Sequence, residues 1–489
     1  MPYALQLSFP AFALAHSRSR AGLILCSSLQ SNTHGEEEDG DGEKKRFQGQ
    51  SKLVLVERCG NGTAKRYVME EDSRVPIILE EFESTDRGLG SLSLSNKELS
   101  WLPDSVKDFI LPAGFPGTVS DDYLEYMLFQ LPTNVTGWIC HTLVTSSLLK
   151  AVGVGSFSGS TAAATAAAIR WVSKDGLGAI GRLFIGGRFG NLFDDDPKQW
   201  RMYADFIGSA GSIFDLSTPL FPSYFLALAS LGNLTKAVAK GLKDPSFRVI
   251  QNHFAVSGNL GEVAAKEEVW EVVAQLLGLA LGVLVLDTPD IQASYTMLVS
   301  TWLSIRLFHL WLRYQSLSVL RFNTINLKRA RILVKSHILK STVPGYVDCN
   351  REEDILAWQR FSKPQINFGV SLEEMIAQEE SISSVKALLE LYAREKYVLS
   401  FQRPGFRAFV SFKVGATSLS VLRSLWQTYW VYENCRDSCD SLDQLRQSLV
   451  ELENKFGDFV KQLEEAGWDV NQLKLKVPSQ FLIEEAVQQ

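Results

Sequence analysis

The spacing of hydrophobic residues predicts helices through the middle of the chain. Residues 104–331 consist mostly of apolar segments with helical spacing, and glycine and proline residues interrupt them. The segment 160-STAAATAAAIRWVSKD-175 is the clearest of these, because alanine has the highest helix propensity and Ser160 or Thr161 can cap its start.

A second helix is expected in residues 194–214. Asp195 or Asp196 provides an N-cap, and Pro197 occupies the first turn, where proline is well tolerated. The carboxylates at this start also face the positive end of the helix dipole.

Two apolar segments, 272–286 and 293–312, raise the question of a membrane. At about 1.5 Å per residue the first reaches only ~22 Å, short of the ~30 Å hydrocarbon layer. The second is long enough but contains Arg306. The short loop 287–292 would make the two an antiparallel pair, and basic residues follow it, as they often do beside a membrane anchor: Arg313, Arg321, Lys328, Arg329 and Arg331. Membrane embedding and burial in a soluble core explain the pair equally well.

The final third of the chain alternates helices and strands. Helices are predicted in 371–395, 415–434 and 441–468, and strands in 396–401, 407–413 and 473–477. Such a mixture predicts a small α+β domain. Near the start, 51–58 and 66–71 read as strands of a small hairpin.

The predicted fold class is therefore mainly α. It comprises a helical core domain with close glycine-mediated helix packing and a smaller C-terminal α+β domain. The predicted divisions are 1–48 (transit-like or disordered), 49–83 (small β entry segment), 84–103 (linker), 104–331 (core) and 332–489 (C-terminal domain).

Charge and cysteine content exclude some partners. The formal net charge of −6 gives no general attraction to nucleic acid. The six cysteines are scattered and show no metal-site spacing, so no metal is expected. The first 35 residues contain Arg18 and Arg20 but no acidic residue, which fits an organelle transit peptide; a plain disordered tail is the alternative.

The stretch 175-DGLGAIG-181 matches the glycine pattern of a dinucleotide-binding turn. That turn requires a preceding strand, whereas the residues before Gly176 are predicted to be helical. We therefore expect a helix-packing motif in which small residues let helices approach closely: Gly176, Gly178, Gly181, Gly186 and Gly190.

One set of charged residues is a candidate cofactor-binding site. Its members are Lys174, Asp175, Arg182, Arg201 and Asp205. Arg201 and Asp205 lie four apart on one helix face, which suits an ion pair. Lys174 could form a Schiff base with pyridoxal phosphate, although no phosphate cradle accompanies it. No catalytic constellation is found, so no enzyme activity is expected.

These segments also resemble a known family. The strings 174-KDGLGAIGRL-183, 198-KQWRMYADF-206 and 111-LPAGFPGTVSDDYLEY-126 are similar to the root UVB sensitive family, over roughly residues 105–330. The string 415-GATS-418 and the pair Gly467-Trp468 resemble the C-terminal domain of its plant members.

The resemblance implies a process but no reaction. Plant members are linked to UV-B responses, seedling development and pyridoxal phosphate homeostasis, some reside in plastids, and members act in complexes with one another. The chain also departs from the family pattern at a few positions. Gly208 and Ser209 stand in place of an Asn-Asp pair, Gln130 in place of Asp and Trp270 in place of Gln.

Three functions remain open. The first, which we favour, is a non-catalytic plastid interaction or scaffold protein, soluble or membrane-seated, whose partner is another family member or a second copy. The second is a membrane carrier component that uses the pair 272–312. The third is a cofactor-binding protein that uses the charged set in 174–205.

Overall fold

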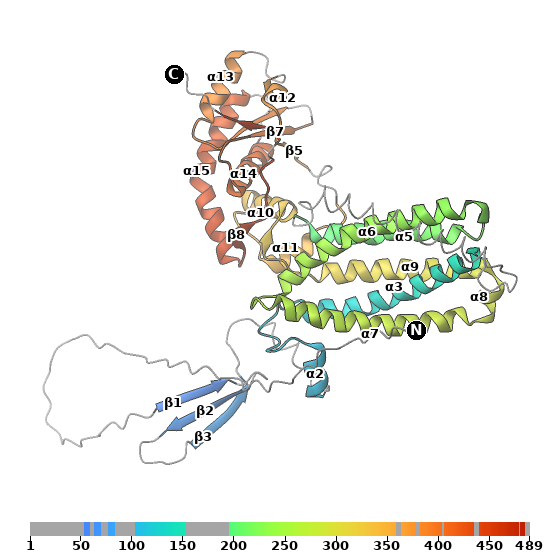
Figure 1. The fold of residues 1–489 in the computed structure, drawn as a ribbon. Coiled ribbons are helices and arrows are strands. Elements are labelled where there is room, and N and C mark those ends of the chain that lie inside the picture. The colour runs from blue at the N-terminus through green and yellow to red at the C-terminus, as the bar shows by residue number, and fades with distance from the viewer. Residues whose placement is uncertain are drawn as a thin grey trace, which may run out of the picture. The chain divides into compact units, whose positions relative to one another are not determined.

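The computed structural model describes residues 53–58, 63–69, 77–83, 103–152, 195–357, 363–376, 382–402, 405–434, 440–478 and 480–484. Most of these residues are helical and the strands are short (Figure 1). The prediction of a mainly α protein with a smaller α+β region is confirmed.

Long helices form a bundle in the central region. They are α3 (Tyr123–Val152), α5 (Pro197–Ser217), α6 (Phe225–Phe254), α7 (Leu260–Leu286) and α9 (Tyr295–Ser318). Short helices accompany them: α2 (Asp104–Ile110), η2 (Pro222–Tyr224) and α8 (Pro289–Ala293). Helix α3 packs on both α7 and α9, and α5 packs along α6, as Figure 1 shows.

Glycine lets these helices approach closely. On α7, Gly278 and Gly282 face α3, and a Cβ atom at Gly278 would lie 2.5 Å from Cβ of Trp138. On α5, a Cβ atom at Gly211 would lie 2.9 Å from the carbonyl oxygen of Gly232 on α6. Neither position has room for a side chain, so backbone-to-backbone packing holds both helix pairs together.

Several predictions fall outside the described residues. They are the helix of 160–175, the glycine motif of Gly176, Gly178, Gly181, Gly186 and Gly190, and three candidate site residues, Lys174, Asp175 and Arg182. The glycine-mediated packing that the structure describes involves other glycines.

Helix α7 is much longer than the apolar run that predicted it. It begins at Leu260, twelve residues before the run 272–286, and its 27 residues reach roughly 40 Å. The estimate of ~22 Å still describes the apolar run 272–286, because the added residues 260–271 include Glu262, Lys266 and Glu271. Among the helices that the structure describes, α7 alone is long and apolar enough to cross a membrane, judged by length and composition.

The C-terminal region packs helices around a small sheet. Strand β7 (Arg407–Lys413) pairs antiparallel with β6 (Tyr397–Gln402) and parallel with β5 (Gln365–Phe368) and β9 (Leu482–Ile483). Its helices are α10 (Leu327–Lys340), α11 (Tyr346–Glu352), α12 (Leu372–Ile376), α13 (Ile382–Leu391), α14 (Ser418–Asn434) and α15 (Ser441–Glu465). Trp426 on α14 is completely buried in this core.

Two details of this region differ from the prediction. The helix expected over 371–395 is described as two short helices, α12 and α13. The strand expected at 473–477 lies earlier in the chain, as β8 (Asp469–Leu473), because it pairs with the distant β4 (Thr324–Ile325). The predicted division at residue 331 stays a prediction, and α10 spans it.

A separate three-stranded sheet lies near the N-terminus. Its strands are β1 (Leu53–Arg58), β2 (Thr63–Met69) and β3 (Ile77–Glu83), in the order β1-β2-β3. The first two confirm the predicted hairpin strands, whereas β3 was not predicted.

Candidate functional site

Helix α5 carries three charged residues on the face that it buries. Lys198, Arg201 and Asp205 stand at positions i, i+3 and i+7, so the helical repeat places them in one row. Asp196 caps the helix, as predicted, and its side chain accepts a 3.1 Å hydrogen bond from the backbone N–H of Gln199. Because buried charge is costly unless it is paired, the partners of this row define the candidate site.

Asp205 pairs with helix α9. Its Oδ2 accepts a hydrogen bond from Nε of Arg313 at 2.5 Å, and its backbone carbonyl accepts one from Nη2 of Arg306 at 2.8 Å. Arg313 also donates to the side-chain oxygen of Gln130 on α3, and Arg306 donates to Oγ of Ser209. These bonds join α3, α5 and α9 at the centre of the bundle.

His309 lies in the same row of α9, between Arg306 and Arg313. Its Nδ1 is 2.9 Å from the carbonyl oxygen of Thr133, which can only accept a hydrogen bond. We therefore assign the proton to Nδ1, which leaves Nε2 as the atom that faces Asp205, 3.8 Å away.

Lys198, at the other end of the row, is fully paired. Its Nζ donates to the carbonyl oxygen of Leu320 at 2.7 Å and to Oδ1 of Asn350 at 2.9 Å, and it lies 3.1 Å from Oε2 of Glu353. Arg329 contacts the same carboxylate at 3.2 Å. Burial alone would raise the pKa of Glu353, but Arg329 and Lys198 outweigh it and lower that pKa to about 2.

Arg201 lies between these two pairs and has no ionic partner among the described residues. It is 1% exposed, and its guanidinium carbon lies 5.1 Å from the ring centre of Phe247 on α6. Its Nε and Nη1 atoms make no hydrogen bond in the part of the chain that the structure describes. The ion pair predicted between Arg201 and Asp205 is not formed, because Asp205 binds Arg313 instead.

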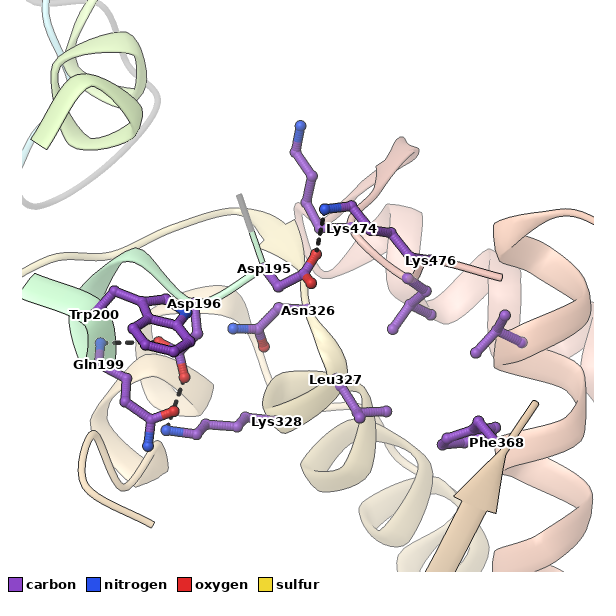
Figure 2. Close-up of a pocket in the computed structure, with 12 residues that line it drawn as sticks. Asp195, Asp196, Gln199, Trp200, Asn326, Leu327, Lys328, Phe368, Lys474 and Lys476 are labelled. Carbon is purple, nitrogen blue, oxygen red and sulfur yellow. Dashed lines mark hydrogen bonds and ion pairs between the residues drawn. The ribbon is translucent and has the colours of Figure 1, made fainter. Parts of the chain in front are cut away.

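A pocket of about 250 Å³ lies beside the start of α5, and Figure 2 shows its lining. Two ion pairs cross its wall, Lys328 with Asp196 at 2.8 Å and Lys476 with Asp195 at 3.5 Å. Apolar side chains such as Phe368 complete the lining. The pocket lies between α5, α10 and the segment after β8, and both of its carboxylates are already paired with lysines.

Of the predicted site residues, the structure describes Arg201 and Asp205, one helical turn apart. Sequence reasoning missed their partners on α3 and α9. A signal was available, since Arg306, His309 and Arg313 are spaced i, i+3 and i+7 within an apolar helix.

Two of the departures from the family pattern fall at this site. Gln130 and Ser209 bind the two arginines of α9, so both positions remain polar and in use. Trp270 donates its indole N–H to the carbonyl oxygen of Ile110 at 2.9 Å. No cluster that could hold a metal ion occurs among the described residues.

Comparison with known proteins identifies the family. The family model described as "Vitamin B6 photo-protection and homoeostasis domain" matches residues 96–341, and the model described as "Root UVB sensitive protein, C-terminal" matches residues 342–479. The chain belongs to the root UVB sensitive family. The resemblance seen in the sequence is thereby confirmed.

Relatives extend this assignment along the whole chain. Protein root UVB sensitive 5 of Arabidopsis thaliana is 61% identical over 480 residues, which cover 96% of this chain and 94% of that protein. RUS family member 1 of Dictyostelium discoideum is 32% identical over 54% of this chain and 50% of its own length. Protein root UVB sensitive 2, chloroplastic, of Arabidopsis thaliana is 26% identical over 75% and 82%. No solved structure matches the chain.

Proposed function

We propose that this chain is a non-catalytic protein of vitamin B6 homoeostasis that is seated in a plastid membrane through its helical bundle. The process comes from the description of the family model that matches residues 96–341. Support for the plastid comes from the acid-free N-terminus and from a relative named as chloroplastic. Support for the membrane comes from α7.

The arrangement of side chains on α7 carries the proposal. Its small residues Ala274, Gly278 and Gly282 are buried against the bundle, whereas Leu276 and Leu284 are each 64% exposed. A helix of a water-soluble protein turns its large apolar residues inward. This helix does the reverse, which is the arrangement expected where lipid surrounds it.

Helix α9 also exposes large apolar side chains. Leu307, Phe308 and Trp311 are about half exposed, while the charged row of α9 faces inward. Charged residues inside and apolar residues outside are typical of helices that pass through a bilayer. Helix α7 is roughly 40 Å long, and its apolar run 272–286 covers ~22 Å of the ~30 Å hydrocarbon layer.

The proposal assigns the bundle a role in binding. The charged groups of α5 and α9 hold one another in ion pairs and hydrogen bonds, which suits a rigid framework. We propose another family member or a second copy of this chain as the protein partner. The glycine-lined packing of the bundle gives a precedent for close helix contacts of that kind.

Alkaline carbonate extraction of isolated plastids tests the membrane seat. The chain is expected to stay with the membrane pellet. Leu276→Asp should shift it toward the wash, because a carboxylate at the centre of a spanning helix costs about 2.5–3.5 kcal/mol. Val450→Asp is the control, since Val450 is 57% exposed on α15, outside the bundle. Release of the unmodified chain into the wash would contradict the proposal and favour a soluble scaffold.

A further inference from the structure

Unpartnered polar atoms gather around Arg201 in the bundle. Besides Nε and Nη1 of Arg201, the hydroxyl groups of Tyr123 and Tyr126 and Oε1 of Glu267 make no hydrogen bond in the described part of the chain. All four side chains are at least nine-tenths buried. They come from three helices, α3, α5 and α7, so the folding of the bundle brings them together.

Electrostatic interactions connect these groups. Tyr126 is within electrostatic range of both Arg201 and Glu267, Tyr123 is within range of Glu267, and Arg201 is within range of Glu267. Arg201 and Glu267 nevertheless form no ion pair with each other. Glu267 is held on its other oxygen by Gln251, at 2.6 Å.

The two paired charges on α5 make Arg201 an exception. Lys198 and Asp205 satisfy their charges with protein partners, at distances of 2.5–3.1 Å. A guanidinium group left buried and unpaired costs far more than a paired one. A native bundle would therefore supply Arg201 with an anion or with water.

We propose that Arg201, Glu267, Tyr123 and Tyr126 bind a small anionic solute within the bundle. The planar guanidinium fork matches a phosphate or a carboxylate with two parallel hydrogen bonds. Oε1 of Glu267 accepts a donor group of the same solute, and the two hydroxyl groups either donate or accept. The site therefore suits a compact molecule with an anionic end and a hydrogen-bonding end.

This inference adds a ligand site to the proposed function and does not depend on the membrane seat. The family description makes a phosphorylated vitamin B6 compound the first probe. Pyridoxine 5′-phosphate is the better choice than pyridoxal phosphate, because it has no aldehyde to react with surface lysines. Inorganic phosphate and unphosphorylated pyridoxine separate the contribution of the anion from that of the ring.

Isothermal titration of the full-length chain in detergent micelles tests the site. Pyridoxine 5′-phosphate should bind the unmodified chain, and Arg201→Gln should weaken binding at least tenfold. Arg446→Gln is the control, because Arg446 is a largely exposed arginine on α15. It should leave the affinity unchanged. If inorganic phosphate displaces pyridoxine 5′-phosphate, the anion site is supported and a simple phosphate can occupy it.

A second variant guards against misfolding. Tyr126→Phe keeps the buried ring and removes only the unpartnered hydroxyl group, so it should fold and should bind pyridoxine 5′-phosphate more weakly. Absence of binding by the unmodified chain, to this ligand and to phosphate, would overturn the proposal and leave water as the partner of Arg201. An equal loss of affinity in Arg446→Gln would overturn it too.

Discussion

Asp205 on α5 binds Arg313 on α9 at 2.5 Å, although Arg201 lies one turn away on its own helix. Asp205 and Arg313 are 108 positions apart in the chain. Their pairing turns the charged face of α5 toward the charged face of α9 and leaves the apolar faces of the bundle outside. The bundle therefore combines an ionic interior with a hydrophobic exterior.

Asp205→Asn should destabilise the bundle. Arg313 is 2% exposed and would lose its carboxylate, and an uncompensated buried charge costs about 3–5 kcal/mol. Thermal unfolding in detergent should show a clear drop in Tm. Asp443→Asn removes a carboxylate from the exposed pair with Arg446 and should change stability by less than about 1 kcal/mol. Equal Tm values for the two variants would refute a structural role for the Asp205 pair.

Gly278→Ala should lower the stability of the folded chain, whereas Gly457→Ala should raise it. A Cβ atom at Gly278 would lie 2.5 Å from Cβ of Trp138, so alanine must push α7 away from α3. Among the described residues nothing outside the backbone of α15 lies within 4 Å of the equivalent position at Gly457, and alanine there should stabilise the helix by about 0.5–1 kcal/mol. Denaturant unfolding measures both. A stabilised Gly278→Ala protein would show that α3 and α7 do not pack as described.

Glu353 should make stability depend on pH below 4.5. Its pKa in the folded chain is about 2, lower than the ordinary 4.5, so the folded state favours the ionised form. The stabilisation is fully present above pH 4.5 and is lost as the pH falls from 4.5 toward 2. A shift of this size corresponds to roughly 3 kcal/mol.

Urea unfolding at pH 7, 4 and 3 measures this effect. Glu353→Gln should be less stable than the unmodified chain at pH 7, and the difference should shrink as the pH falls. A difference that stays constant over this range would contradict the depressed pKa of Glu353.

Local sequence rules predicted the elements whose signals are local. The start of α5 followed from Asp196 and Pro197, and the structure has the cap and the proline at those positions. The start of α7 was missed because Glu271 stands directly before the apolar run and looked like its boundary. In the bundle Glu267 is buried and Glu271 is partly buried, so a charged residue did not mark the end of this helix.

The candidate site was predicted only in part, because its partners depend on tertiary packing. The spacing of Arg201 and Asp205 predicted an ion pair, yet helix α9 brings Arg313 to Asp205 and leaves Arg201 without an ion-pair partner among the described residues. The spacing of residues within α5 does not show that α9 packs against it. The same holds for β4 and β8, which pair across more than a hundred residues.

Labelling with a water-soluble maleimide tests most directly whether the large apolar side chains of α7 face lipid. Leu276→Cys and Val450→Cys place a thiol at positions with similar exposure, 64% and 57%, so only their surroundings differ. In intact plastid membranes, Val450→Cys should label above the background of the unmodified chain and Leu276→Cys should not. After detergent and denaturation both should label. If Leu276→Cys labels as fast as Val450→Cys in intact membranes, α7 faces water and the membrane seat is wrong.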